Sequence, residues 1–153
     1  MTYPGMPRPK RLAKPFTLTA PSPLESAEQQ AFFRWVRLMQ GYHKPGAGLI
    51  FAIPNQRKGA AEGARFKAEG VLAGVPDIFV AVPRLSPGSC ENPDADFHGL
   101  WIELKRVGGS LADCSAAQNR VMADLAAQGY RVEVCFGWQH AMRVTREYLG
   151  WGE

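Results

Sequence analysis

The chain has 153 residues, of which 46% are hydrophobic, 21% charged and 10% aromatic, which indicates one globular domain with a core of its own. No apolar run is long enough for a membrane-spanning helix, and the Pro-rich first 22 residues lack the apolar stretch of a signal peptide, so we expect neither. Three cysteines, Cys90, Cys114 and Cys135, cannot pair completely and match no zinc-finger spacing, so we expect a reduced, cytoplasmic protein.

The net charge of +4 is concentrated at the amino-terminal end. Residues 1–23 hold four basic residues and no acidic one, whereas residues 24–153 hold the other 14 basic residues (18 less four) and all 14 acidic ones. The four are Arg8, Lys10, Arg11 and Lys14. Because this segment is also rich in proline, we expect a flexible basic tail attached to a folded domain over 24–153. Such a tail either contacts a polyanion such as nucleic acid or only aids solubility.

The order of the predicted elements indicates an α/β fold. The predicted helices cover residues 25–40, 59–73, 115–128 and 139–149. The predicted strands cover residues 49–53, 77–82, 99–105 and 130–136, and residues 83–98 predict a surface loop. Two glycines, Gly63 and Gly70, disfavour the second helix. We therefore expect helices flanking a mixed central sheet of about four strands.

The third predicted strand carries an acid and a lysine on one face, because side chains alternate along a strand. One face has Leu100, Ile102 and Leu104, and the other has Trp101, Glu103 and Lys105. Glu103 and Lys105 therefore point the same way, about 6–7 Å apart along the strand. Such pairs are common on solvated strand faces, so taken alone this pair favours a solvated face over a functional site.

The second predicted strand begins at Asp77, directly after Pro76. If this strand pairs with the third, Asp77 lies beside Glu103, and two carboxylates about 4 Å apart repel each other unless a cation lies between them. Such oxygen ligands suit Mg²⁺ or Mn²⁺, and a neighbouring lysine can orient a water or contact a phosphate. The alternative is that Asp77 only caps a turn.

These residues resemble a nuclease signature. The segments Gly74-Val75-Pro76-Asp77 and Ile102-Glu103-Leu104-Lys105 are similar to the Asp and Glu-x-Lys motif of the PD-(D/E)XK nucleases. Within that superfamily the chain resembles the small stand-alone form of the virus-type replication-repair nuclease (VRR-Nuc) family. Further similar segments follow in order: Glu28-Gln29-Gln30 with Trp35, and residues 51–55, 63–70, 115–118 and 129–132. The resemblance implies a restriction-endonuclease-like core and runs from about residue 25 to about residue 139.

The resemblance also implies metal-dependent hydrolysis of DNA phosphodiester bonds. It implies that Asp77, Glu103 and the backbone carbonyl of Leu104 bind Mg²⁺ or Mn²⁺. Lys105 would then stabilise the attacking water or the charge that develops at phosphorus.

Two helix residues complete the implied site. Glu28 matches the additional carboxylate of the family, with Glu25 one turn earlier as the alternative. Gln118 matches a polar position beside the site, where it would contact a phosphate or a water. In each case a solvent-facing or helix-capping polar residue is the alternative.

The contacts to DNA are less sharply defined. Basic and amide side chains gather between the first and second predicted strands, and their chemistry suits phosphate contacts. They are Asn55, Arg57, Lys58, Arg65 and Lys67. A solvated helix face is the alternative.

The resemblance further implies a homodimer that acts on branched DNA such as a four-way (Holliday) junction. In the sequence itself, only the apolar content of the last predicted helix hints at an interface, and core packing would explain it equally. Two other readings stand beside this one: a catalytically silent DNA-binding accessory protein on a nuclease fold, and a restriction-type enzyme with a fixed target sequence.

Overall fold

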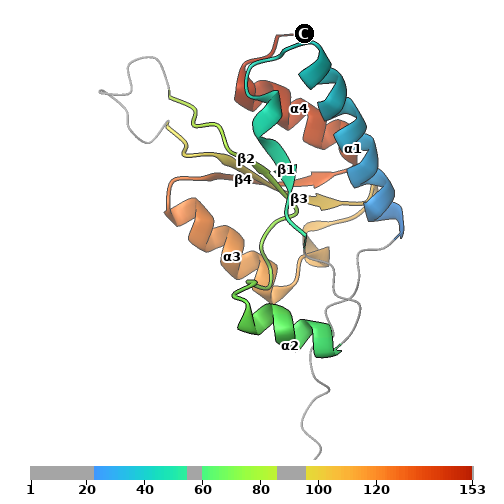
Figure 1. Ribbon diagram of the computed structural model, residues 1–153, viewed down its shortest axis with the longest axis vertical. Coiled ribbons are helices and arrows are strands. Elements are labelled where there is room, and N and C mark those ends of the chain that lie inside the picture. Colours follow the sequence, from blue (N-terminus) through green and yellow to red (C-terminus); the bar gives the residue numbers. More distant parts are fainter. Residues whose placement is uncertain (1–22, 55–59, 86–95, 153) are drawn as a thin grey trace, which may run out of the picture.

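The computed structural model describes residues 23–54, 60–85 and 96–152, which form a mixed sheet with helices on both faces (Figure 1). The helices are α1 (Pro23–Gly41), α2 (Ala60–Ala68), α3 (Ala116–Ala127) and α4 (Trp138–Leu149), with short 3₁₀ helices η1 (Ala47–Leu49) and η3 (Leu111–Asp113). The strands are β1 (Ile50–Ala52), β2 (Ile78–Val80), β3 (Leu100–Lys105) and β4 (Arg131–Phe136). Helices α1 and α4 pack on one face of the sheet and α3 on the other, which confirms the predicted α/β class.

The strands lie in the order β1-β2-β3-β4. β2 pairs antiparallel with both β1 and β3, whereas β3 and β4 run parallel. Parallel neighbours need a crossover connection, and α3 provides it here. Because α3 runs back along the sheet, its first turn lies near the carboxyl end of β3.

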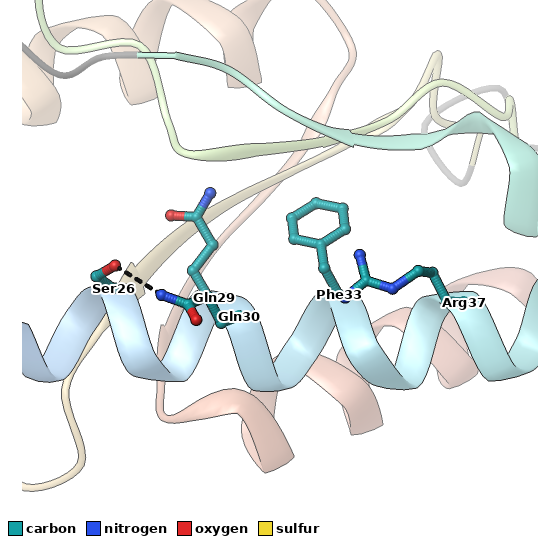
Figure 2. A pocket seen from close by; sticks show the side chains of 5 residues that line it. All are labelled: Ser26, Gln29, Gln30, Phe33 and Arg37. Carbon is teal, nitrogen blue, oxygen red and sulfur yellow. Dashed lines mark hydrogen bonds between the residues drawn. The ribbon is translucent and has the colours of Figure 1, made fainter.

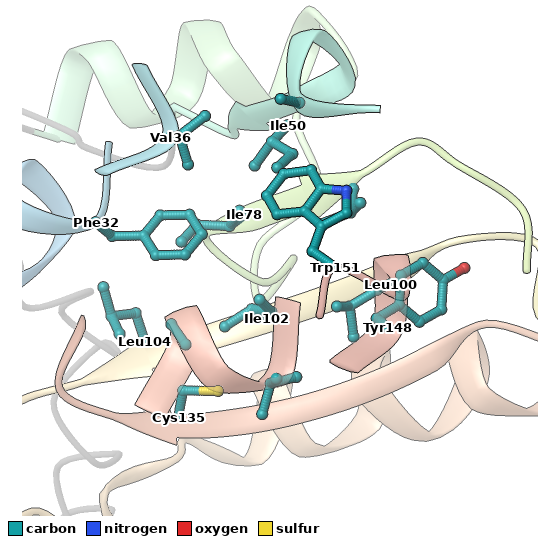
Figure 3. Close-up of a cluster of buried hydrophobic side chains, with 14 residues drawn as sticks. Phe32, Val36, Ile50, Ile78, Leu100, Ile102, Leu104, Cys135, Tyr148 and Trp151 are labelled. Atoms are coloured by element: carbon teal, nitrogen blue, oxygen red, sulfur yellow. The ribbon is translucent and has the colours of Figure 1, made fainter. Parts of the chain in front are cut away.

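The hydrophobic core fills the space between the sheet and the pair α1 and α4 (Figure 3). Leu100, Ile102 and Leu104 supply the β3 side of this core, as their alternation predicted. From α1, Phe32 and Val36 pack against them and are almost completely buried. Within the described ranges, neither α1 nor any other helix is both long and apolar enough to cross a membrane.

The apolar residues of the last helix belong to this same core. Val144 and Tyr148 of α4 and the following Trp151 are buried. The Tyr148 hydroxyl donates to the carbonyl of Val82 at 2.7 Å, and the Trp151 indole N–H donates to that of Pro45 at 2.9 Å, so both buried polar groups have partners. Core packing therefore explains these apolar residues, and they do not by themselves indicate a dimer interface.

All the predicted elements are present, and their ends agree to within two residues except at the end of the second helix. The helix predicted over 59–73 is wrong beyond Ala68. Gly70 adopts φ +88°, and the N–H of Val71 donates to the carbonyl of Phe66 at 2.8 Å. This is a Schellman motif, in which a left-handed glycine terminates the helix.

The predicted surface loop over 83–98 begins and ends as a continuation of the β2–β3 hairpin. Arg84 and Phe97 form an antiparallel bridge with two backbone hydrogen bonds of 2.9 Å. Residues 86–95 lie outside the described residues, as do residues 1–22, for which a flexible basic tail was predicted.

The segment that enters β2 passes close to the first turn of α3 at Gly74. This residue adopts φ +90°, and a Cβ atom placed on it would lie 2.6 Å from the carbonyl carbon of Ala117. We predict that Gly74→Ala lowers the free energy of unfolding by about 2 kcal/mol or more, because the methyl group meets backbone at an unfavourable φ. Urea denaturation measures the change. Gly48→Ala is the matched control, since a Cβ there meets no atom within 4 Å; equal midpoints for the two variants would contradict the prediction.

Candidate active site

The antiparallel pairing of β2 with β3 brings two carboxylates together. The register sets Ile78 opposite Ile102, and one further step sets Asp77 opposite Glu103. The Cβ atoms of directly opposed residues are about 4.5–5.5 Å apart. The structure therefore places Asp77 beside Glu103, as the pairing argument expected.

Asp77, directly before β2, forms hydrogen bonds to β3 and to the end of β1. Its Oδ2 accepts the N–H of Leu104 at 2.9 Å, and its backbone carbonyl accepts the N–H of Ile53 at 2.8 Å. Burial raises the pKa of the Asp77 carboxyl group, and this effect exceeds the lowering by the Leu104 N–H and by the charge of Lys105. The carboxylate is thus held in place at an electrostatic cost.

Glu103 is 1% exposed and lies at the centre of the group. Its Oε1 accepts from the Lys105 amine at 2.9 Å and from the side-chain amide of Gln118. Its Oε2 is buried without a hydrogen-bond partner among the described residues. Burial, and after it the charge of Asp77, raises the pKa of Glu103 to about 7, although Lys105 acts in the opposite direction. A buried carboxylate oxygen without a partner is costly, so this atom is suited to bind a cation.

Lys105 is 6% exposed and shares the strand face of Glu103. Burial alone lowers the pKa of Lys105, but the hydrogen bond and charge of Glu103 outweigh it, so the pKa is raised and the amine stays protonated. The buried thiol of Cys114 lies near the same group: burial raises its pKa, while the charge of Lys105 lowers it. The sequence analysis missed Cys114 as a neighbour of the site, because nothing in its spacing shows that the chain folds back after β3.

Gln118 reaches Glu103 from the first turn of α3. Its Oε1 accepts the N–H of Ser115 at 2.8 Å, and the Ser115 hydroxyl accepts the N–H of Gln118 at 3.2 Å, which makes a capping box at the start of the helix. The amide orientation that this box fixes turns the NH₂ group toward Glu103. Gln118 therefore caps the helix and also contacts Glu103, whereas its contact with a phosphate or a water stays a prediction.

The carbonyl of Leu104 has a special position in the sheet. The N–H and C=O of a strand residue point to the same side, and the Leu104 N–H points to Asp77. Continuing the register sets Pro76 opposite Leu104. Proline has no N–H to donate, so the Leu104 carbonyl does not meet a ladder donor from Pro76 and remains suited to bind a metal.

The two candidate carboxylates of α1 have different surroundings. Glu28 accepts the N–H of Trp138, the first residue of α4, at 2.8 Å, and so caps that helix where its dipole favours an anion. Glu25 instead acts electrostatically on the site, because its charge raises the pKa of both Asp77 and Glu103. The structure thus associates Glu25 with the paired acids and Glu28 with the start of α4.

The oxygen atoms gathered here fit a hard divalent cation. Asp77, Glu103 and the Leu104 carbonyl are donors of the type that Mg²⁺ and Mn²⁺ prefer. Among the residues that the structure describes, no three His, Cys, Asp or Glu side chains are grouped to hold a metal by themselves. Mg²⁺ commonly uses one or two carboxylates and retains several waters, so a backbone carbonyl and two acids, of which Glu103 has an unpaired Oε2 among the described residues, suit it.

The predicted DNA-contact residues are only partly visible. Asn55, Arg57 and Lys58 lie outside the described residues. Arg65 and Lys67 are exposed in the last turn of α2. The Arg65 guanidinium pairs with Glu69 at 3.4 Å and lies over the ring of Phe66 at 5.3 Å from its centroid. The structure does not bring these two basic residues into the carboxylate group.

The mixed sheet, with two acids and a lysine on adjacent strands and a glutamine from the crossover helix beside them, agrees with the nuclease-type fold that the sequence resemblance implies. The chain belongs to the VRR-NUC domain family, whose model matches residues 24–139. This confirms the family resemblance found in the sequence and covers most of the domain predicted over 24–153.

A solved structure supports the same assignment. The chain is similar to a VRR_NUC domain protein with 28% sequence identity and a TM-score of 0.65, over 85% of this chain and 91% of that one. The shared fold therefore extends over nearly the whole of the other protein.

A second similarity is confined to a short stretch of much longer proteins. The chain is 34% identical over 92 residues to phenyloxazoline synthase MbtB from two strains of Mycobacterium tuberculosis and from Mycobacterium bovis. This match covers 60% of the chain but spans only 6% of the length of those proteins. It therefore carries no activity over to this chain.

Because the pKa of Glu103 is raised, we expect the stability of the metal-free protein to depend on pH. Unfolded glutamate has a pKa near 4.5, whereas folded Glu103 has one of about 7, so between these values the folded state retains a proton that the unfolded state has lost. The unfolding free energy should then fall by about 3 kcal/mol between pH 5 and pH 8. Urea denaturation in chelator measures the fall.

Glu103→Gln cannot titrate and should lose most of this pH dependence. The control is Glu69→Gln, which removes an exposed carboxylate and should keep the behaviour of the wild type. An identical pH dependence in wild type and Glu103→Gln would contradict the prediction.

Proposed function

We propose that this protein is a metal-dependent, structure-specific DNA endonuclease that hydrolyses phosphodiester bonds. The observation that carries the proposal is the Glu103 carboxylate: one oxygen is held by Lys105 and Gln118, and the other is buried without a partner among the described residues. A buried carboxylate oxygen without a hydrogen-bond partner is costly, even where the other oxygen is paired with a lysine. A cation shared with Asp77 would offset that cost, which gives a physical reason for keeping both acids in the site.

The residues match the needs of phosphodiester hydrolysis, which requires an activated water and stabilisation of negative charge at phosphorus and on the leaving oxygen. Asp77, Glu103 and the Leu104 carbonyl are the groups that would hold Mg²⁺ or Mn²⁺, which when bound lowers the pKa of water and neutralises that charge. Lys105 is protonated and fixed by Glu103, so it can orient the attacking water or stabilise the phosphoryl oxygens. Gln118 of α3 donates to the same oxygen of Glu103 as Lys105 does.

The finer parts of the proposal concern substrate and assembly. We take branched DNA such as a four-way (Holliday) junction as the substrate and a homodimer as the active form, because a two-fold axis presents identical sites to opposed strands. The support is the resemblance of this chain to the small stand-alone members of the family.

The α1 carboxylate that completes the site is proposed to be Glu25. We expect Glu25→Gln to lower the metal-dependent cleavage rate by at least about tenfold with little change in stability. In contrast, Glu28→Ala should lower the free energy of unfolding by about 1 kcal/mol, because the Trp138 N–H loses its acceptor. Cleavage rates and urea midpoints of both variants decide the assignment. The reverse pattern would transfer the metal-site role to Glu28.

The activity itself is tested with a panel of linear duplex, flap and four-way-junction DNA. Wild-type protein should cut branched DNA in Mg²⁺ or Mn²⁺ and be inactive in excess chelator. Lys105→Ala should lower the rate by about 10²-fold or more, because it removes the charge that is fixed next to the phosphate. Glu69→Gln, which alters an exposed surface ion pair, is the matched control and should keep the wild-type rate.

The contrary outcomes separate the alternative functions. Binding of DNA without cleavage by the wild type would favour the silent accessory protein. Cleavage only at a fixed sequence in linear duplex would favour the restriction-type enzyme. Full activity in chelator would overturn the metal requirement.

A further inference from the structure

A groove runs along one flank of α1, beside the face that packs into the core (Figure 2). It has a volume of about 270 Å³ and is largely open to solvent. Gln29 and Phe33 project from the helix to the same side, and the guanidinium of Arg37 extends back along the helix toward Phe33 (Figure 2). The groove residues are Ser26, Gln29, Gln30, Phe33 and Arg37.

The groove is lined by hydrogen-bond donors and one positive charge. None of its five described lining residues is acidic. Gln30 donates to the Ser26 hydroxyl at 3.3 Å, and a side-chain amide has a second N–H to offer. Arg37 is exposed, and its planar guanidinium matches the geometry of a phosphate. The lining is therefore complementary to a chain of phosphates rather than to a cation.

The groove begins next to the proposed active site. Its first residue, Ser26, follows Glu25, whose charge acts on Asp77, Glu103 and Lys105. From Ser26 to Arg37 the helix rises about 16 Å. At about 3.4 Å of duplex axis per nucleotide, this length corresponds to four or five nucleotides of one DNA strand.

The groove is open rather than enclosing, so it suits part of an extended chain better than a buried small molecule. Its volume of about 270 Å³ lies below the roughly 300–1,000 Å³ typical of pockets that enclose a drug-sized ligand. Phe33 offers a partly buried apolar surface in the middle, since it packs edge-on to Phe32 at 5.4 Å between ring centroids. An apolar wall flanked by amide and guanidinium donors fits a sugar–phosphate backbone.

We propose that this groove binds the phosphate backbone of the DNA strand that continues from the cleaved bond. The proposal rests on the proposed nuclease function for its ligand, but it is a statement about binding and is tested without cleavage. Arg37 is the charged phosphate contact, Gln29 and Gln30 are the neutral ones, and Phe33 packs against the sugar.

The test compares two arginines of the same helix. Arg34 is exposed like Arg37 but is not among the described residues that line the groove, so Arg37→Ala and Arg34→Ala change the net charge equally. DNA binding is measured by fluorescence anisotropy in chelator, with four-way-junction and single-stranded probes, over a range of salt concentrations. Arg37→Ala should weaken binding about fivefold and reduce the slope of log K against log salt by about 0.7–0.9. Arg34→Ala should change neither by more than experimental error.

A second pair of variants tests the neutral part of the groove. Gln29→Glu keeps the shape of the side chain but places a negative charge against the phosphates, and it should weaken binding about tenfold. Gln128→Glu makes the same exchange at the exposed C-terminal end of α3 and should leave binding unchanged. Arg37→Lys, which retains the charge but not the planar guanidinium, should recover part of the affinity lost in Arg37→Ala.

The outcomes separate this proposal from the proposed function. Equal losses of DNA affinity from Arg37→Ala and Arg34→Ala would show a diffuse attraction between charges and would overturn the proposed binding in the groove. A change in the mass of the DNA-free protein on Arg37→Ala would assign the groove to a second copy of the chain and also overturn it. If the wild-type protein cuts no DNA but the Arg37 and Gln29 variants weaken DNA binding as expected, the proposed nuclease function is wrong, whereas the proposed DNA binding by the groove is supported.

Discussion

The antiparallel register of β2 on β3 is the constraint on which the site depends. It sets Asp77 opposite Glu103 by the same pairing that sets Ile78 opposite Ile102. A slip of one residue would move every side chain of β2 to the opposite face of the sheet, which would expose Ile78 and separate the two acids. Burial of the apolar face therefore enforces the geometry of the polar face, and the Asp77 bond to the Leu104 N–H fixes the pairing where the ladder ends.

The carboxylates of the site repel one another, and the fold holds them together at the expense of its own stability. Burial raises the pKa of both Asp77 and Glu103, the charge of Asp77 raises that of Glu103 further, and the charge of Glu25 has a smaller effect on both in the same direction. Lys105 offsets part of this repulsion through one oxygen of Glu103, but the other oxygen is left without a partner among the described residues. Functional sites commonly retain such locally unfavourable arrangements, and here the strain is of the kind that a divalent cation relieves.

The sequence predicts those features that arise from local periodicity. The alternation along β3 separates Ile102 from Glu103, and it requires no knowledge of the rest of the chain. The sequence does not show whether Glu25 or Glu28 belongs to the site, because the two lie three residues apart on one helix. Only the path of α4 determines which of them caps this helix at Trp138. The sequence likewise does not show that one oxygen of Glu103 lacks a partner among the described residues or that Cys114 lies near Lys105. Both depend on how the segment after β3 folds back.

Helix α1 contributes to the core, to the groove and to the acids near the candidate site. Helical periodicity and position along the axis place these three groups of residues on different parts of the helix. Phe32 and Val36 face the core, whereas Phe33 and Arg37 are each one residue further and so lie about 100° around the helix, on the flank of the groove. Along the axis, the acids of α1 lie in its first turns and both its arginines in the second half. A polyanion lying along this flank is attracted at the Arg37 end and repelled at the Glu25 end. If DNA binds as proposed, this order of charges along the helix favours a DNA strand that is held at the Arg37 end, and a cation bound by the acids would lower the repulsion at the other end.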